Sequence, residues 1–168
     1  MSNKPTKYYS SIQERRVADA LGWSVVSGSG ARDFHPGDIV SDRWMGECKT
    51  HTVPGSKLKF DAKVWEKICE EASSKFKYPV LFVDDGSQSL DKTWCVFLPD
   101  VYCPEGVVRY NYDGKFKTNL IFEHPDMNFT YKRLLMMSDS KIPIIILNLS
   151  GKVTGLVSFR KFQQLFQE

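Results

Sequence analysis

The sequence predicts a mixed α/β domain with the element order α-β-β-β-α-β-β, followed by a C-terminal extension. Apolar side chains recur at helical spacing over residues 11–21 and 61–77. Between these segments, short runs rich in β-branched and aromatic residues are bounded by Gly, Ser and Pro, which is typical of strands. Because 168 residues suit one domain, we expect a single unit with a core over about 8–103 and an extension over about 104–168.

The composition excludes several classes of protein. Hydrophobic residues make up 42% and charged residues 26% of the chain, which is typical of a globular protein. No apolar run approaches the ~20 residues of a membrane helix. The N-terminal "MSNKPTKYYSS" lacks the apolar core of a signal peptide. The four cysteines form no C-x-x-C pair, so we expect a reduced, cytoplasmic protein.

The net charge of +3 comes from the N-terminal half. Residues 1–80 hold 13 Lys and Arg against 10 Asp and Glu, whereas residues 81–168 hold 10 of each. A basic excess in this half fits a polyanionic partner, although three charges is also an excess that chance produces.

Each element of the core has its own signal. The pattern Ser11-x-x-Glu14 fits a capping box and predicts that the first helix begins near residue 11. Strands are expected at 23–27, 38–41 and 44–50, with a tight turn at 42–43. The second helix is expected over 61–77, and its apolar positions step by four. They are Phe60, Val64, Ile68, Ala72 and Phe76. Two buried strands are expected at 78–85 and 92–99.

The signals after Pro104 are weaker. Residues 106–122 predict a hairpin that turns at Asp113-Gly114, and residues 131–137 predict a short helix. A very apolar strand is expected at 142–150 and an amphipathic helix at 158–168. Either the apolar strand or the phenylalanine face of that helix could serve as a subunit interface, or both could be core.

An acidic constellation lies in "HPGDIVSDRWMGECKTH", residues 35–51. Glu47 and Lys49 are two apart on a predicted strand and therefore share a face. Asp38 comes nine residues before Glu47, so a hairpin would return it to the same point. Carboxylates of Asp38 and Glu47 and the backbone carbonyl of Cys48 are oxygen ligands that Mg²⁺ prefers. A metal-dependent site for phosphodiester hydrolysis fits this set, and a solvated charged hairpin is the alternative.

Three further groups bear on this choice. Glu14 lies over the apolar positions 17, 18 and 21 of its helix, so it points toward the core or along its edge. A buried carboxylate needs a partner such as a metal. Alternatively, Glu14 only closes the capping box with Ser11. The Gly-rich loop at 27–37 offers Ser27, Ser29 and Arg32 as phosphate donors, or is a plain connection. Lys57 and Lys59 are candidate DNA-backbone contacts or a solvated face.

These segments resemble the PD-(D/E)XK nuclease superfamily, and within it most closely the archaeal-type Holliday junction resolvases. The resemblance is carried by Glu14, by "SGSGARDFHPGDIV" and by "MGECKT", and it covers about residues 8–100. It implies a restriction-endonuclease-like core and assigns the catalytic and metal roles to Glu14, Asp38, Glu47 and Lys49. Ser27 or Ser29 would be the functional loop serine. "PGD" departs from the family's "PD", and residues 63–65 stand where related nucleases often carry a polar residue.

The resemblance implies a Mg²⁺-dependent DNA endonuclease, with Mn²⁺ as a substitute metal, in the cytoplasm of a prokaryotic or phage-infected cell. The leading substrate is the four-way DNA junction, which two subunits of a homodimer would nick on opposed strands. A restriction or repair nuclease that acts on duplex DNA is the alternative within enzymes. A non-catalytic DNA-binding domain on the same scaffold is the alternative outside them, and it would be expected to lose one of Asp38, Glu47 or Lys49.

Overall fold

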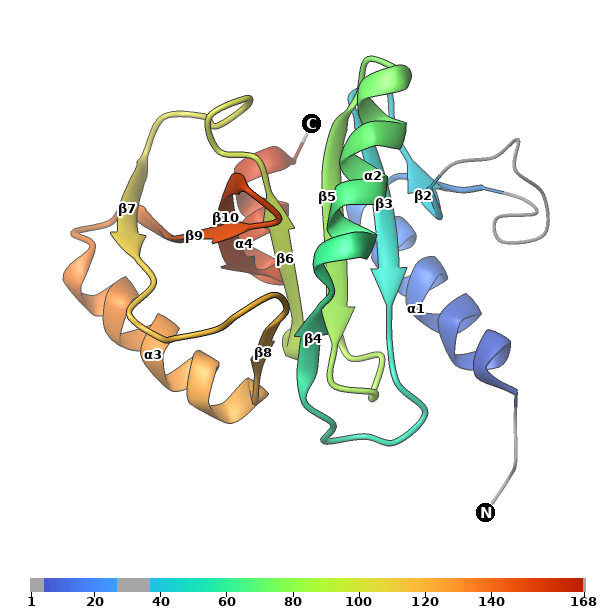
Figure 1. The fold of residues 1–168 in the computed structure, drawn as a ribbon, viewed down its shortest axis with the longest axis horizontal. Helices are drawn as coiled ribbons and strands as arrows, with labels where there is room; N and C mark the ends of the chain where they lie inside the picture. Colours follow the sequence, from blue (N-terminus) through green and yellow to red (C-terminus); the bar gives the residue numbers. More distant parts are fainter. Residues whose placement is uncertain (1–4, 27–36, 168) are drawn as a thin grey trace.

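A large mixed β-sheet, covered by helices on both faces, organises the chain (Figure 1). The computed structural model describes residues 5–26 and 37–167. The helices are α1 (Thr6–Leu21), α2 (Ala62–Ser74), α3 (His124–Met137) and α4 (Phe159–Phe166). The strands are β1 (Ser24–Val25), β2 (Ile39–Val40), β3 (Trp44–Lys49), β4 (Leu58–Phe60), β5 (Tyr78–Asp84), β6 (Thr93–Phe97), β7 (Val107–Asn111), β8 (Leu120–Phe122), β9 (Ile142–Leu149) and β10 (Lys152–Ser158). Eight of them form one sheet in the order β1-β2-β3-β5-β6-β10-β9-β7, and β4 pairs with β8. The predicted α/β class with a mixed sheet between helices is therefore confirmed.

The sheet separates two hydrophobic cores. One face packs against α2, α3 and the β4–β8 pair, and its core includes Trp65 of α2 and Tyr131 of α3. The other face packs against α1 and α4, and its core includes Trp44 and Phe162. In Figure 1, α2 lies in front of β3 and β5, and α1 lies behind them. Within the described part of the chain, no helix is long and apolar enough to cross a membrane.

The first helix starts five residues earlier than the sequence predicts. It begins at Thr6 after Pro5, whose fixed φ of −65° suits the residue before a helix. Ser11 therefore lies inside the helix, where its hydroxyl donates to the carbonyl of Lys7 at 2.8 Å. The predicted capping box of Ser11 and Glu14 is wrong, because a hydroxyl that bonds back to residue i−4 is compatible with a continuing helix.

The second helix matches its prediction except at the C-terminal end. Asp61 caps its N-terminus by accepting from the backbone N–H groups of Lys63 and Val64. The helix ends at Ser74, and Phe76 follows with φ of 57° and a side chain that is 97% exposed. The assignment of Phe76 to the apolar face is therefore wrong. The helix ends where the Lys77 N–H donates to the Ala72 carbonyl at 2.9 Å. The apolar spacing of four continues in the sequence beyond this end.

The C-terminal third continues the sheet rather than forming an appendage. β10 pairs with β6, β9 pairs with β10, and β7 lies parallel to β9 at the edge. The predicted hairpin over 106–122 is wrong, because β7 pairs with β9 and β8 pairs with β4. β10 and β4 had no counterpart in the sequence prediction, and α3 extends from His124 rather than from residue 131.

The two surfaces considered as subunit interfaces are core. Ile144 and Leu149 of β9 are fully buried. The phenylalanine face of α4 packs on the sheet, where the Phe162 ring lies 5.2 Å and the Phe166 ring 4.8 Å from the ring of Trp44, centre to centre. Aromatic contacts at such distances stabilise beyond their buried area. The phenylalanines of α4 therefore hold the C-terminal helix against β3. Because these rings and the apolar side chains of β9 are buried, neither is free to contact a second subunit.

We expect Gly46→Ala to lower the free energy of unfolding by about 1–3 kcal/mol, because it overpacks the core below β3. A Cβ at Gly46 would lie 2.9 Å from Cγ1 of Ile39 and 3.0 Å from Cε2 of Phe82, and both side chains are buried. Urea denaturation measures the change. Ser24→Ala, at an exposed position of β1, is the control and should change stability by less than about 0.5 kcal/mol. Equal stability of both variants would show that the β2–β3–β5 packing is looser than described.

Candidate active site

The β2–β3 hairpin places Asp38 beside Glu47. Ile39 pairs with Gly46 and Val40 with Met45, and the N–H of Asp38 donates to the Gly46 carbonyl at 2.8 Å. The Asp38 carboxylate lies against the backbone of Cys48, the residue after Glu47, because its Oδ2 accepts from the Cys48 N–H. The hairpin therefore returns Asp38 to the part of β3 that carries Glu47, as the sequence predicts, and the charge of Asp38 acts on Glu47.

Gly37 sets the direction in which the chain enters this hairpin. Its φ is +75°, a conformation that side-chain-bearing residues rarely adopt, and a Cβ there would lie 2.7 Å from Cγ of Met45. Its N–H donates to the Glu71 carboxylate of α2 at 3.3 Å. The glycine of "PGD" is thus required by the backbone turn that leads directly into Asp38.

Asp38 is held by a backbone hydrogen bond from β3. Its Oδ2 accepts from the N–H of Cys48 at 2.9 Å. The Cys48 side chain lies on the other face of β3, in the core with α1 and α4, where burial raises the pKa of its thiol. Cys48 therefore contributes backbone to the site, while its thiol stays inert.

Glu47 and Lys49, two residues apart on β3, form an ion pair beside Asp38. The Lys49 Nζ lies 3.0 Å from Oε1 of Glu47. Burial and the charge of Asp38 raise the pKa of Glu47, against the attraction of Lys49. Burial alone lowers the pKa of Lys49, but the combined charges of Glu47 and Asp38 outweigh it, so that the net pKa is raised. Lys49 is therefore a cation at neutral pH.

Glu14 approaches the same charges from α1. Its helix packs on the opposite face of the sheet through Val17 and Ala18, and Glu14 itself is half-buried. Burial, followed by the charges of Asp38 and Glu47, raises the pKa of Glu14 to about 7. Glu14 is thus electrostatically coupled to Asp38, Glu47 and Lys49, the other three residues singled out in the sequence.

Gln13 is a residue of this region that sequence reasoning missed. Its side chain is 1% exposed, and its Nε2 donates to the backbone carbonyl of Lys49 at 2.7 Å. This bond ties α1 to the end of β3 and so fixes Glu14 next to the hairpin. The spacing of four from Gln13 to the apolar Val17 was the available signal that it faces inward.

A second polar cluster, also missed, lies where β3 and β5 end. Asp84 is fully buried, and its Oδ1 accepts from the Thr50 hydroxyl at 2.6 Å and from the Gly86 N–H at 2.7 Å. Arg16 of α1 donates to the Gln88 carbonyl at 2.8 Å. Burial raises the pKa of Asp84, and its Oδ2 has no hydrogen-bond partner among the described residues. Two acids directly after the apolar run 79–83 were the sequence signal.

The expected DNA contacts are only partly visible. Ser27, Ser29 and Arg32 lie outside the described residues. Lys57 and Lys59 are exposed around β4, and Lys59 lies 3.7 Å from the Asp61 carboxylate. The segment before β4 is tied to the end of β5 by the Ser56 N–H, which donates to the Asp85 carbonyl at 2.8 Å. These lysines thus follow the strand that carries Glu47 and Lys49.

The side chains are not arranged as a finished metal centre. Among the residues that the structure describes, no three His, Cys, Asp or Glu groups are placed to hold an ion. Asp38 is bonded to the Cys48 amide, and Glu47 to Lys49. The donor chemistry nevertheless fits a hard divalent cation, because every candidate ligand is an oxygen, and burial followed by neighbouring carboxylate charge raises the pKa of Glu14 and of Glu47. A cation would relieve that repulsion.

Comparisons of the chain with protein-family models, with curated proteins and with solved structures find no match.

We expect Glu14→Gln to stabilise the metal-free protein at pH 8 and to leave its stability unchanged at pH 4.5. The pKa of Glu14 is about 7 in the folded state against 4.5 as its ordinary value, so the folded protein holds a proton between these values. Stability is therefore lost as the pH rises through this window. Glutamine carries no charge and avoids the loss. With allowance for solvent at this half-buried group, we expect about 1 kcal/mol, or about 3 °C in melting temperature.

Thermal unfolding in chelator at both pH values measures this difference. Glu70→Gln, at an exposed position of α2, is the matched control and should shift the melting temperature equally little at pH 4.5 and pH 8. A Glu14→Gln protein that is no more stable than the wild type at pH 8 would mean that Glu14 is not strained by Asp38 and Glu47.

Proposed function

We propose that the chain is a metal-dependent DNA endonuclease with a PD-(D/E)XK type of site and a restriction-endonuclease-like core. One observation carries the proposal: the β2–β3 hairpin holds Asp38 on the Cys48 N–H, beside the Glu47–Lys49 ion pair, and the charges of Asp38 and Glu47 both act on Glu14. The order of α1, β1–β3, α2, β5 and β6 supports it, since this is the element order of that core.

Each residue has a role that its surroundings support. Glu14, Asp38 and Glu47 would hold a Mg²⁺ ion, which Mn²⁺ could replace, with the Cys48 carbonyl as a further oxygen ligand. The bound metal would supply an activated water and neutralise charge at the scissile phosphate. Lys49, whose raised pKa keeps it protonated, is suited to hold the phosphate rather than to take a proton from water. The Cys48 N–H orients Asp38.

A four-way DNA junction is the proposed substrate, cut on opposed strands by two subunits. The support is the resemblance of "SGSGARDFHPGDIV" and "MGECKT" to the archaeal-type resolvases. Because β9 and the phenylalanine face of α4 are buried, the proposed homodimer must use another surface.

We expect the purified protein to nick a synthetic four-way junction in Mg²⁺ and to leave linear duplex of the same arms intact. Glu47→Gln removes a metal ligand and should lower the cleavage rate about a hundredfold or more, while junction binding persists. Glu66→Gln, exposed on α2, should cleave like the wild type. Denaturing gel electrophoresis of end-labelled strands resolves the nicks.

The other outcomes are informative. Equal cutting of both substrates would retain the nuclease and reject the junction as substrate, which favours a restriction or repair enzyme. Tight binding without cutting in Mg²⁺ or Mn²⁺ would reject the enzyme and favour a DNA-binding domain. Cleavage that survives in Glu47→Gln would place the active site elsewhere.

A further inference from the structure

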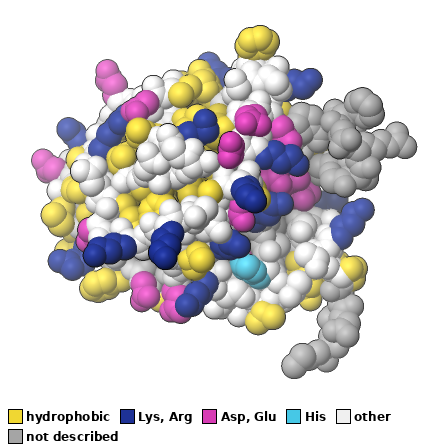
Figure 2. All heavy atoms as spheres, viewed as in Figure 1, with side chains coloured by type: hydrophobic (Ala, Val, Ile, Leu, Met, Phe, Trp, Pro, Cys, Tyr) yellow, Lys and Arg dark blue, Asp and Glu magenta, His cyan; other side chains and the backbone are white. Residues whose placement is uncertain are grey.

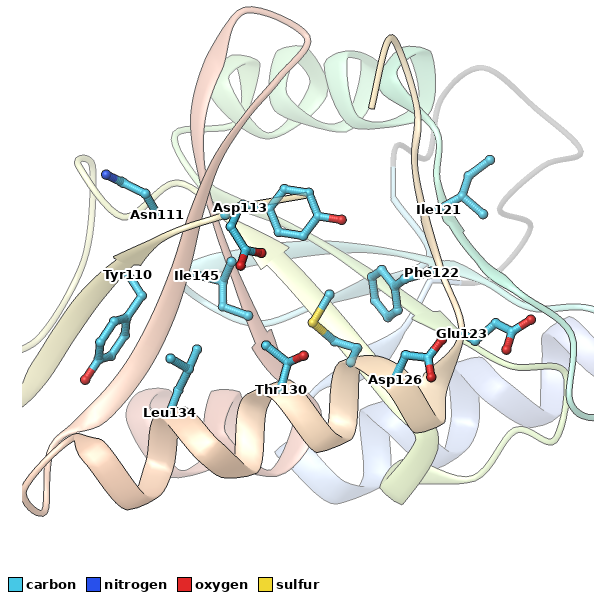
Figure 3. Close-up of a pocket in the computed structure, with 12 residues that line it drawn as sticks. Tyr110, Asn111, Asp113, Ile121, Phe122, Glu123, Asp126, Thr130, Leu134 and Ile145 are labelled. Atoms are coloured by element: carbon cyan, nitrogen blue, oxygen red, sulfur yellow. The ribbon is translucent and has the colours of Figure 1, made fainter. Parts of the chain in front are cut away.

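A cavity of about 450 Å³ lies at the opposite end of the sheet from the carboxylates of the β2–β3 hairpin (Figure 3). It is formed by β7, β8, β9 and α3, and none of the residues assigned to the nuclease site lines it. Sites for small molecules typically enclose about 300–1,000 Å³. The cavity is therefore large enough for a small organic ligand, and the nuclease proposal gives it no role.

The floor of the cavity is apolar. Phe122, Met127 and Ile145 contribute to it and are at least nine-tenths buried, and Leu134 of α3 is partly buried beside them. Figure 2 shows hydrophobic side chains reaching the surface on this face, in the region between β7, α3 and β8. A ligand with an apolar body would remove this surface from water, which is favourable.

The walls carry negative charge and no positive charge. Asp113 follows β7, whereas Glu123 and Asp126 lie at the N-terminal end of α3, and in Figure 3 Asp113 stands across the opening from the other two. Among the described residues, no Lys or Arg lines the cavity, and no ion pair engages any of the three carboxylates. The carboxylates therefore favour a cation in the opening and disfavour nucleic-acid phosphates.

Two tyrosines also line the cavity. Tyr110 and Tyr112 are partly buried at the β7 side, and their ring faces attract cations. Carboxylates, aromatic rings and an apolar floor in one cavity are complementary to an ammonium group on an apolar body. We propose that this cavity binds a small organic cation with an apolar body, at a site separate from the nuclease residues.

The test uses three probes that share one apolar body: 4-phenylbutylamine, 4-phenylbutan-1-ol and 4-phenylbutyrate. Isothermal titration calorimetry of the full chain should show the amine binding about tenfold or more tighter than the alcohol, and no binding of the acid. Asp113→Asn and Asp126→Asn should each weaken amine binding about fivefold, and added salt should weaken it further. Asp139→Asn, after α3 and outside the cavity, should bind the amine like the wild type.

Three results would overturn the proposal: no binding of the amine to the wild type, equal affinities for the three probes, or an equal loss in Asp139→Asn. Because the probe series uses the wild-type protein alone, it remains decisive even where a variant folds poorly. Melting temperatures of the variants verify that they are folded. Failure of the DNA-cleavage test would leave this result unchanged, because the cavity shares no residue with the nuclease site.

Discussion

The antiparallel register of β2 and β3 is the constraint on which the proposed site depends. Ile39 pairs with Gly46. The Ile39 side chain fills the space that a Cβ of Gly46 would occupy, so a larger residue shifted into this position would clash with it. A shift by one residue would turn Glu47 and Lys49 to the other face, into the core with Trp44 and Cys48. The parallel pairing of β3 with β5 independently holds β3 with these side chains on their present faces.

This register forces like charges together, and the surroundings only partly offset their repulsion. The Cys48 N–H bonds Asp38, and Lys49 pairs with Glu47, yet burial first and the neighbouring carboxylates second keep the pKa values of Glu14 and Glu47 raised. If these acids had no ligand, stability alone would favour positions in solvent or next to cations. The unrelieved repulsion is what a divalent cation would remove, and this links the fold to the proposed chemistry.

The sequence was informative where structure depends on neighbours in the chain. Alternation over 44–49 placed Met45, Glu47 and Lys49 on one face, and the turn at 42–43 returned Asp38 to the backbone of β3. Prediction failed where partners are distant. Residues 107–122 read as a hairpin, but their strands pair with β9 and β4, which no local pattern reveals. Gln13 and Asp84 were missed for the same reason, since their roles appear only once α1 docks on β3 and β5 lies beside it.

The central claim is that the hairpin carboxylates are a divalent-metal site, and direct titration with Mn²⁺ tests it without any assumption about the substrate. Calorimetry or electron paramagnetic resonance of the wild type and of Asp38→Asn gives the answer. We expect saturable binding to the wild type at or below millimolar Mn²⁺, and a loss of about tenfold or more in affinity in the variant. Equal binding by both proteins, or none up to about 10 mM, would contradict the account and reduce the hairpin to a charged surface.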